Sequence, residues 1–170
     1  MRRTCGNTPP PAKYVAPVNT PHYTFLVRAL GIDYGGRRIG LALSDASGML
    51  ASPLRVFERP RSGPETLRLV CQEIARLVAD DDGLATVVVG WPRRLDGTPN
   101  AQTPIVEAFA RALRQAVSMP VVLQDERLSS HEAESRLALR ERDWRKRKQT
   151  LDAAAAAVVL QDFLDEQSRA

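Results

Sequence analysis

Residues 30–45 read LGIDYGGRRIGLALSD. The apolar run before Asp33 predicts a strand, and the second apolar run, Ile39 to Leu43, predicts another. Between them lies the pair Gly35-Gly36, and glycine lets a chain turn tightly and lets a ligand approach the backbone. We therefore expect a hairpin that holds the carboxylate of Asp33 at the point where a buried strand leaves the core.

Around this hairpin, the sequence predicts three short strands followed by two more that alternate with helices. The first three are expected at Phe25–Asp33, Ile39–Asp45 and Leu50–Phe57, and their short connections predict an antiparallel meander. The other two, Thr86–Val89 and Pro120–Gln124, are almost entirely apolar, which is typical of strands buried on both faces of a sheet.

Apolar residues at helical spacing occupy the intervals between these strands. Helices are expected to begin near Pro64 and Pro104, at a Ser-x-x-Glu capping box over residues 129–132, and near Leu151, where the last helix runs to Glu166. Helices that alternate with buried strands imply parallel pairing and helices on both faces of the sheet. The chain is thus predicted to be an α/β protein with a mixed five-stranded sheet, in the element order of the ribonuclease H-like three-layer fold.

Length and composition favour one domain. The chain has 170 residues, of which 44% are apolar and only 5% aromatic, so aliphatic side chains must build the core. Residues 1–24 are rich in proline and are expected to be a disordered extension, residues 25–166 the folded domain and residues 167–170 a tail. No apolar run reaches the roughly 18 residues of a membrane span and no signal peptide is visible, so a cytoplasmic protein is expected.

The two cysteines carry little chemistry. Neither Cys5 nor Cys71 sits in a spacing typical of metal ligands, and two cysteines cannot form a disulfide framework. Cys71 lies among apolar residues of a predicted helix and should be packed, whereas Cys5 is expected to be a free thiol in the extension.

Positive charge gathers in two segments of a chain whose net charge is +4. Residues 1–28 carry four basic residues and no acid, and residues 140–148 carry six basic residues against two acids. Concentrated positive charge suits a polyanion such as nucleic acid, and the alternative is a solvated tail and a solvated loop. The solvated reading is favoured for residues 1–28, and nucleic acid for residues 140–148.

Acidic residues from distant parts of the chain fall at positions typical of functional sites. Asp33 ends a predicted strand, Asp125-Glu126 follow another, and Asp152 lies at the expected start of the last helix. In open sheets, sites lie beyond the carboxyl ends of the strands. Magnesium takes oxygen ligands and keeps several waters, so a few carboxylates suffice, and two such ions can support phosphodiester hydrolysis.

Each acid also has a structural explanation. Asp33 could cap the turn, and Asp125 or Glu126 could pair with Arg127. Asp152 in a first helical turn would be stabilised by the helix dipole. The Gly-rich flanks favour function for Asp33. Three charged residues after a buried strand are costly if they are buried unpaired, which favours function for Asp125 or Glu126. Asp152 alone favours the structural explanation.

The sequence resembles the YqgF (RuvX) family of bacterial nucleases. The resemblance covers roughly residues 29–166 and rests on GIDYGGRRIGLALSD (31–45), VVVGWPRRLDGT (87–98), PVVLQDERLSS (120–130) and RKRKQTLDAAAAAVVLQDFL (145–164). It implies a ribonuclease H-like fold similar to that of Holliday junction resolvases of the RuvC type. It also implies a role in maturation of the 5′ end of pre-16S rRNA or in junction resolution.

Carried over position by position, the resemblance implies site residues. The catalytic and metal-binding triad would be Asp33, Glu126 and Asp152, with Asp125 assisting and Mg²⁺ or Mn²⁺ as cofactor. Nucleic acid would be bound by basic residues: Arg37, Arg127, Arg145, Lys146, Arg147 and Lys148. The chain lacks the acid that ends the fourth strand in typical ribonuclease H-like nucleases, and the glutamate of the Asp-Glu-Arg motif follows the next strand instead.

Three functions remain open at this level. The first is a metal-dependent nuclease acting on pre-rRNA, with ribosomal particles as partners, or on branched DNA. The second is a non-catalytic nucleic-acid-binding factor. The third is a phosphotransferase of the actin and sugar-kinase type, whose first strand also carries Asp-x-Gly, but one short domain lacks the second lobe needed to enclose a nucleotide. RNA and DNA substrates, and a monomer and a homodimer, are not separated, although junction resolution would favour a dimer.

Overall fold

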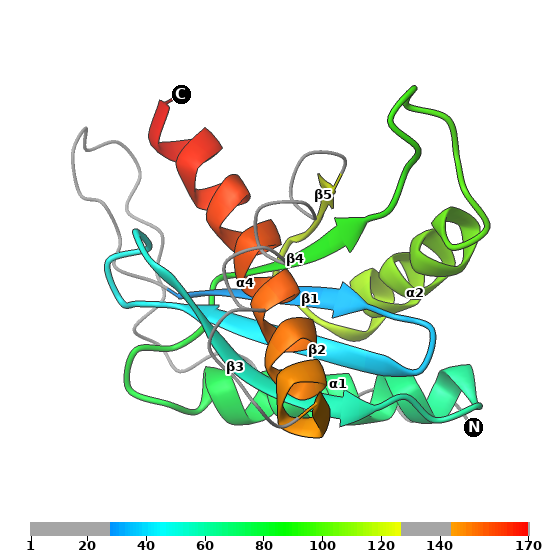
Figure 1. Cartoon of the computed structure of the whole chain (residues 1–170). Coiled ribbons are helices and arrows are strands. Elements are labelled where there is room, and N and C mark those ends of the chain that lie inside the picture. Colours follow the sequence, from blue (N-terminus) through cyan, green and yellow to red (C-terminus); the bar gives the residue numbers. More distant parts are fainter. Residues whose placement is uncertain (1–27, 127–143, 170) are drawn as a thin grey trace.

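A five-stranded mixed sheet forms the centre of the molecule in the computed structural model (Figure 1). The structure describes the backbone of residues 28–126 and 144–169, and the side chains of 28–126 and 152–169. The helices and strands of this part follow in the order β1 (Ala29–Tyr34), β2 (Arg38–Ser44), β3 (Ala51–Glu58), α1 (Gly63–Val78), β4 (Thr86–Trp91), α2 (Thr103–Ala116), β5 (Val121–Asp125) and α4 (Trp144–Arg169).

The strands are arranged in the spatial order β3-β2-β1-β4-β5. Strands β1, β2 and β3 pair antiparallel, as expected for the meander, whereas β4 pairs parallel to β1 and β5 pairs parallel to β4. The carboxyl ends of β1, β3, β4 and β5 therefore meet at one edge of the sheet, here called the carboxyl edge. The mixed sheet and its strand order confirm the predicted α/β, ribonuclease H-like fold.

Helices cover both faces of the sheet. Helices α1 and α2 lie behind it in Figure 1 and α4 crosses in front. Alternate residues of β1 pack on opposite faces of the sheet, because successive side chains of a strand point in opposite directions. Leu30 and Ile32 belong to the apolar cluster that includes residues of α1 and α2, and the cluster on the other face joins Ala42 and Val88 to α4. Both clusters are mainly aliphatic, as the composition requires.

Helix α4 approaches the sheet closely because small residues face each other there. A Cβ added at Gly31 would lie 2.8 Å from the carbonyl oxygen of Ala156, and one added at Gly40 would overlap the carbonyl oxygen of Asp152. The helix side of this contact is alanine-rich, with Ala156 fully buried. These glycines therefore let the helix backbone rest on β1 and β2, and they bring Asp152 to the sheet.

Two elements extend further than the sequence predicted. Helix α4 begins at Trp144 and not near Leu151, and β4 continues through Gly90 to Trp91. The predicted helix from Ser129 and the predicted extension lie outside the described residues. Cys71 is buried, as expected. None of the helices in the described part is long and apolar enough to cross a membrane.

Candidate active site at the carboxyl edge

Strand alternation places three of the predicted positions on the same face of the sheet. Gly31 faces α4, so Asp33, two residues further along β1, also faces α4. Gly31 is aligned with Val88, which brings Gly90 alongside Asp33, and Gly90 is in turn aligned with Gln124 of β5. The side chain of Gln124 reaches α4 by a 3.0 Å hydrogen bond to Glu166, so Glu126, two residues beyond Gln124, continues on this face.

Glu126 lies directly over the backbone of Gly90. A Cβ added at Gly90 would lie 3.3 Å from Cγ of Glu126, 2.8 Å from its Cδ, and closer still to Oε1. The Glu126 N–H also donates to the carbonyl oxygen of Trp91 at 3.3 Å. The carboxyl group of Glu126 thus occupies the space that a side chain at position 90, near the end of β4, would fill.

Burial and mutual repulsion shift the pKa values of two of the acids. Burial, followed by the negative charge of Asp152, raises the pKa of Asp33 to about 6. Burial, followed by the charges of Asp33 and Asp125, raises the pKa of Glu126 to about 7. The two shifts together show that Asp33 interacts electrostatically with both Glu126 and Asp152.

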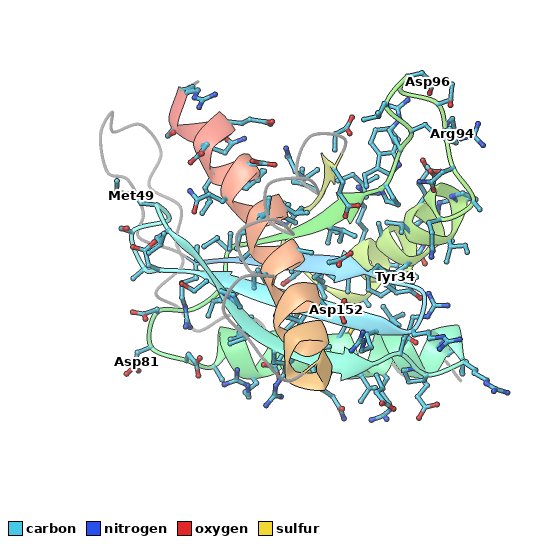
Figure 2. All side chains as sticks on the ribbon, viewed as in Figure 1. Tyr34, Met49, Asp81, Arg94, Asp96 and Asp152 are labelled. Atoms are coloured by element: carbon cyan, nitrogen blue, oxygen red, sulfur yellow. The ribbon has the colours of Figure 1, made fainter. Side chains whose placement is uncertain are left out.

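Asp152 forms an ion pair with an arginine and does not lie at the start of its helix. Its Oδ2 lies 2.7 Å from Nε of Arg38, and the two side chains keep 29% and 19% of their exposure. Because α4 begins at Trp144, Asp152 lies in its third turn, and the helix-dipole explanation for Asp152 is wrong, since that effect fades within the first turn. Figure 2 shows Asp152 on α4 where the helix crosses the sheet.

The donor chemistry of this edge fits a divalent cation, although no cluster is preformed. Within the part of the chain that has described side chains, no group of three or more His, Cys, Asp or Glu residues is arranged to hold a metal ion. Asp33 and Glu126 nevertheless present hard oxygen donors whose ionised forms are disfavoured by burial and by each other. A divalent cation such as Mg²⁺ or Mn²⁺ would relieve both penalties.

The other predicted residues have mixed outcomes. Asp125 ends β5 and adds its charge to the pKa shift of Glu126. Arg37 is exposed in the turn between β1 and β2, at the carboxyl edge. Arg127 and the side chains of residues 145–148 lie outside the described residues, so their predicted role in nucleic-acid binding stays a prediction.

Sequence reasoning missed two arginines at this edge. The guanidinium carbon of Arg59 lies 4.8 Å from the centroid of the Tyr34 ring, and that of Arg93 lies 4.3 Å from the centroid of the Trp91 ring. The sequence did contain a signal for these two arginines: an aromatic residue directly follows Asp33, and another directly follows Gly90. Trp91 carries Arg93 over its ring and lies directly before Pro92.

A mixed five-stranded sheet of ribonuclease H-like strand order, with carboxylates gathered at its carboxyl edge, defines the fold class of the protein. The model of one family in this class, described as RuvX: Holliday junction resolvase, matches residues 27–166. The chain therefore belongs to the RuvX family, which confirms the resemblance seen in the sequence and, at the level of the family, the prediction of a nuclease.

Curated relatives match over most of their length. A protein of Geobacillus thermodenitrificans named "Putative pre-16S rRNA nuclease" is 40% identical, over 82% of this chain and 98% of the relative. Proteins of the same name are 40% identical in Syntrophus aciditrophicus, over 82% of this chain and 89% of the relative, and 38% identical in Clavibacter michiganensis, over 83% and 84%.

Solved structures show more distant likeness. Thermus thermophilus RuvC in complex with a Holliday junction substrate has a TM-score of 0.49 and 16% identity, over 83% of this chain and 96% of that chain. A ROK hexokinase from the same organism has a TM-score of 0.44 and 20% identity, over 65% of this chain and 38% of that chain. The fold itself is established by the strand order and pairing described above.

Proposed function

We propose that this chain is a metal-dependent nuclease that hydrolyses phosphodiester bonds in structured nucleic acid, with the 5′ end of pre-16S rRNA as its substrate. Asp33, Glu126 and Asp152 would be the catalytic and metal-binding residues. The observation that carries the proposal is the burial of two mutually repelling carboxylates, Asp33 and Glu126, at the carboxyl edge of the sheet. The names of the curated relatives support rRNA as the substrate.

A bound Mg²⁺ or Mn²⁺ ion would supply the positive charge that activates a water molecule and stabilises the charge developing on the phosphate. The protein's part is to hold oxygen donors in place before the substrate arrives. Asp33 is fixed within β1, and Glu126 is fixed by its N–H bond to Trp91 and by its contact with Gly90. Sites built on strands in this way keep their geometry better than sites on loops.

Arg38 has a separate part in the proposed site. Its Nε holds the Oδ2 atom of Asp152, so it orients that carboxylate and balances its charge beside Asp33. Since Gly40 lets the backbone at Asp152 rest on β2, the position of the third acid depends on β2 twice, through the ion pair and through the close contact.

Junction resolution is the second candidate, because the matching family model is described as a Holliday junction resolvase. A resolvase must cut two strands symmetrically, so this function would need a homodimer, whereas rRNA processing allows a monomer and would bring ribosomal particles as partners in the cytoplasm.

Cleavage of two substrates side by side tests the proposal. A 5′ leader fragment of pre-16S rRNA and a four-way DNA junction would each be incubated with Mg²⁺, with Mn²⁺ and with EDTA. Asp33→Asn serves as the inactive variant, and Asp81→Asn is its matched control, because Asp81 is exposed at the opposite edge of the sheet (Figure 2).

Metal-dependent cutting of the RNA, lost in Asp33→Asn and kept in Asp81→Asn, supports the rRNA nuclease. Symmetric cutting of the junction alone would move the assignment to the resolvase. Binding without cutting under every condition would contradict the enzyme and leave a non-catalytic nucleic-acid-binding factor.

A further inference from the structure

Arginines from three parts of the chain gather at the carboxyl edge beside the acids. Strand β3 ends next to the turn between β1 and β2, where the N–H of Arg59 donates to the carbonyl oxygen of Arg37 at 2.9 Å. The Nη1 atom of Arg59 donates to the carbonyl oxygen of Gly35 in the same turn at 3.1 Å. Arg93 follows β4, the neighbour of β1 on its other side. We call Arg37, Arg59 and Arg93 the arginine rim.

Two members of the rim are held by aromatic rings. Arg59 lies over Tyr34, which is only 8% exposed and stacks on Phe109 with the ring centroids 4.3 Å apart. Arg93 lies over Trp91, whose Nε1 donates to Glu107 of α2 at 3.0 Å. Because both rings contact α2, the core helps to position the two guanidinium groups, together with the turn that holds Arg59.

The rim and the acids belong to the same strand ends but to opposite faces of the sheet. Asp33 faces α4, whereas the next residue, Tyr34, packs in the cluster on the side of α1 and α2. Gly90 likewise faces Glu126 on the α4 side, and the next residue, Trp91, contacts α2. A ligand that crosses the carboxyl edge would therefore meet carboxylates on one side and arginines on the other.

The rim arginines differ from four other arginines in the described part of the chain, which are paired with acids. Four arginines, namely Arg28, Arg38, Arg55 and Arg76, form ion pairs with carboxylates. The ion pairs among the described residues include none of the three rim arginines. Arg93 also keeps a buried Nε without a hydrogen-bond partner among these residues. A guanidinium that stacks on a ring still presents N–H groups at its edge, and these match the oxygens of a phosphate.

The opposite flank of the site is acidic. A hollow of about 470 Å³ lies between the end of β5 and the carboxyl-terminal part of α4, and most of its charged residues are acids: Asp125, Asp162, Asp165 and Glu166, against Arg169. Phosphates would be repelled there. A nucleic acid would therefore avoid this acidic hollow. The charge distribution favours a path that runs from the active-site acids, Asp33 and Glu126, toward the arginine rim.

We propose that Arg37, Arg59 and Arg93 bind the phosphate backbone of the nucleic acid on the side of the active site away from α4. The inference rests on the proposed function, since it needs a nucleic acid to lie across the carboxyl edge. The N–H groups at the edges of the two guanidinium groups that lie over Tyr34 and Trp91 match the oxygens of a phosphate. Phosphate contacts position the strand and carry no sequence preference.

The test is equilibrium binding by the full chain carrying Asp33→Asn, which prevents cleavage, measured at several salt concentrations on the pre-16S leader RNA and on the four-way DNA junction. Each rim arginine is changed to alanine singly and all three together. Arg111→Ala is the matched control, an exposed arginine on α2. Arg59→Lys and Arg93→Lys keep the charge but lose the planar group.

Each rim alanine should weaken binding about 3- to 10-fold and reduce the slope of log affinity against log salt by roughly one, on any sequence of the bound substrate. Arg111→Ala should change neither quantity, and the lysine variants should keep the slope. A triple variant that keeps the affinity and slope of its parent would contradict the role proposed for the arginine rim and leave the proposed nuclease function standing. Lysine variants that lose as much slope as the alanine variants would also contradict that role, since the effect would then be structural. No binding by the parent protein to either nucleic acid would instead overturn the proposed function.

Discussion

Replacement of Gly90 by alanine should lower the cleavage rate on the order of 100-fold and leave the fold intact. The added methyl carbon would lie 2.8 Å from Cδ of Glu126 and closer to Oε1, whereas ordinary contact begins at about 3.4 Å. The obstructing group is the end of a flexible side chain at the first residue beyond β5, so Glu126 would give way and the strands would not. Its carboxyl group would be displaced by about 1 Å or more.

The size of the effect follows from that displacement. A misplacement of about 1 Å in a catalytic site costs on the order of 100-fold in rate. The φ angle of Gly90 is not in the positive range, so alanine is allowed there and the free energy of unfolding should change by less than about 1 kcal/mol. Gly40→Ala is the contrasting variant, because its methyl group would meet backbone atoms of Asp152 and should cost about 1–3 kcal/mol of stability.

Single-turnover cleavage and urea unfolding measure the two quantities. In a double-mutant cycle, Gly90→Ala should add little to Glu126→Ala, since both changes remove the same carboxylate from the site. Activity of Gly90→Ala within threefold of the wild type would refute the reasoning. So would a loss of activity that is matched by a loss of stability like that of Gly40→Ala.

Two other expectations concern stability. Because the pKa of Asp33 is raised from 3.8 to about 6, the wild-type protein has the full stability of this group below pH 4 and loses it as pH rises through 6. The stability of Asp33→Asn relative to the wild type should therefore increase by about 2–3 kcal/mol between pH 4 and pH 7.5 in EDTA, and a pH-independent difference in urea unfolding would contradict the shift. Arg38→Ala should destabilise the protein by about 1–2 kcal/mol, less than for a fully buried ion pair because both side chains are partly exposed. Arg37→Ala, its exposed neighbour, should change the melting temperature little, and equal melting temperatures for the two variants would argue against a stabilising Arg38–Asp152 pair.

The sheet could be predicted from the sequence because its signals are local. The apolar runs on either side of Gly35-Gly36 and the nearly continuous apolar run of Thr86–Val89 are read from neighbouring residues alone, and both became strands. The start of α4 was missed because the basic residues at 145–148 were taken as a nucleic-acid-binding segment ahead of the last helix and not as part of that helix. Lysine, arginine and glutamine are nevertheless good helix formers, and the backbone there is helical.

The site was predictable only in part. Asp33 lies near the end of β1 and Glu126 directly follows β5, so their meeting at the carboxyl edge follows from the topology. The contact of Glu126 with Gly90 could not be predicted, because it depends on how two neighbouring strand ends are aligned. The stacking of Arg59 on Tyr34 likewise depends on β3 ending beside the first turn, a tertiary contact that local sequence does not encode.

The central claim is that Asp33 and Glu126 are halves of one divalent-metal site. Calorimetric titration of the full chain with Mn²⁺ at pH 7.5 tests it without requiring a substrate, using Asp33→Asn, Glu126→Gln and the control Asp81→Asn. We expect saturable binding by the wild type and by Asp81→Asn, and binding weakened at least 10-fold in each of the two site variants. Equal Mn²⁺ affinity in all four proteins, or no binding by the wild type, would contradict the claim.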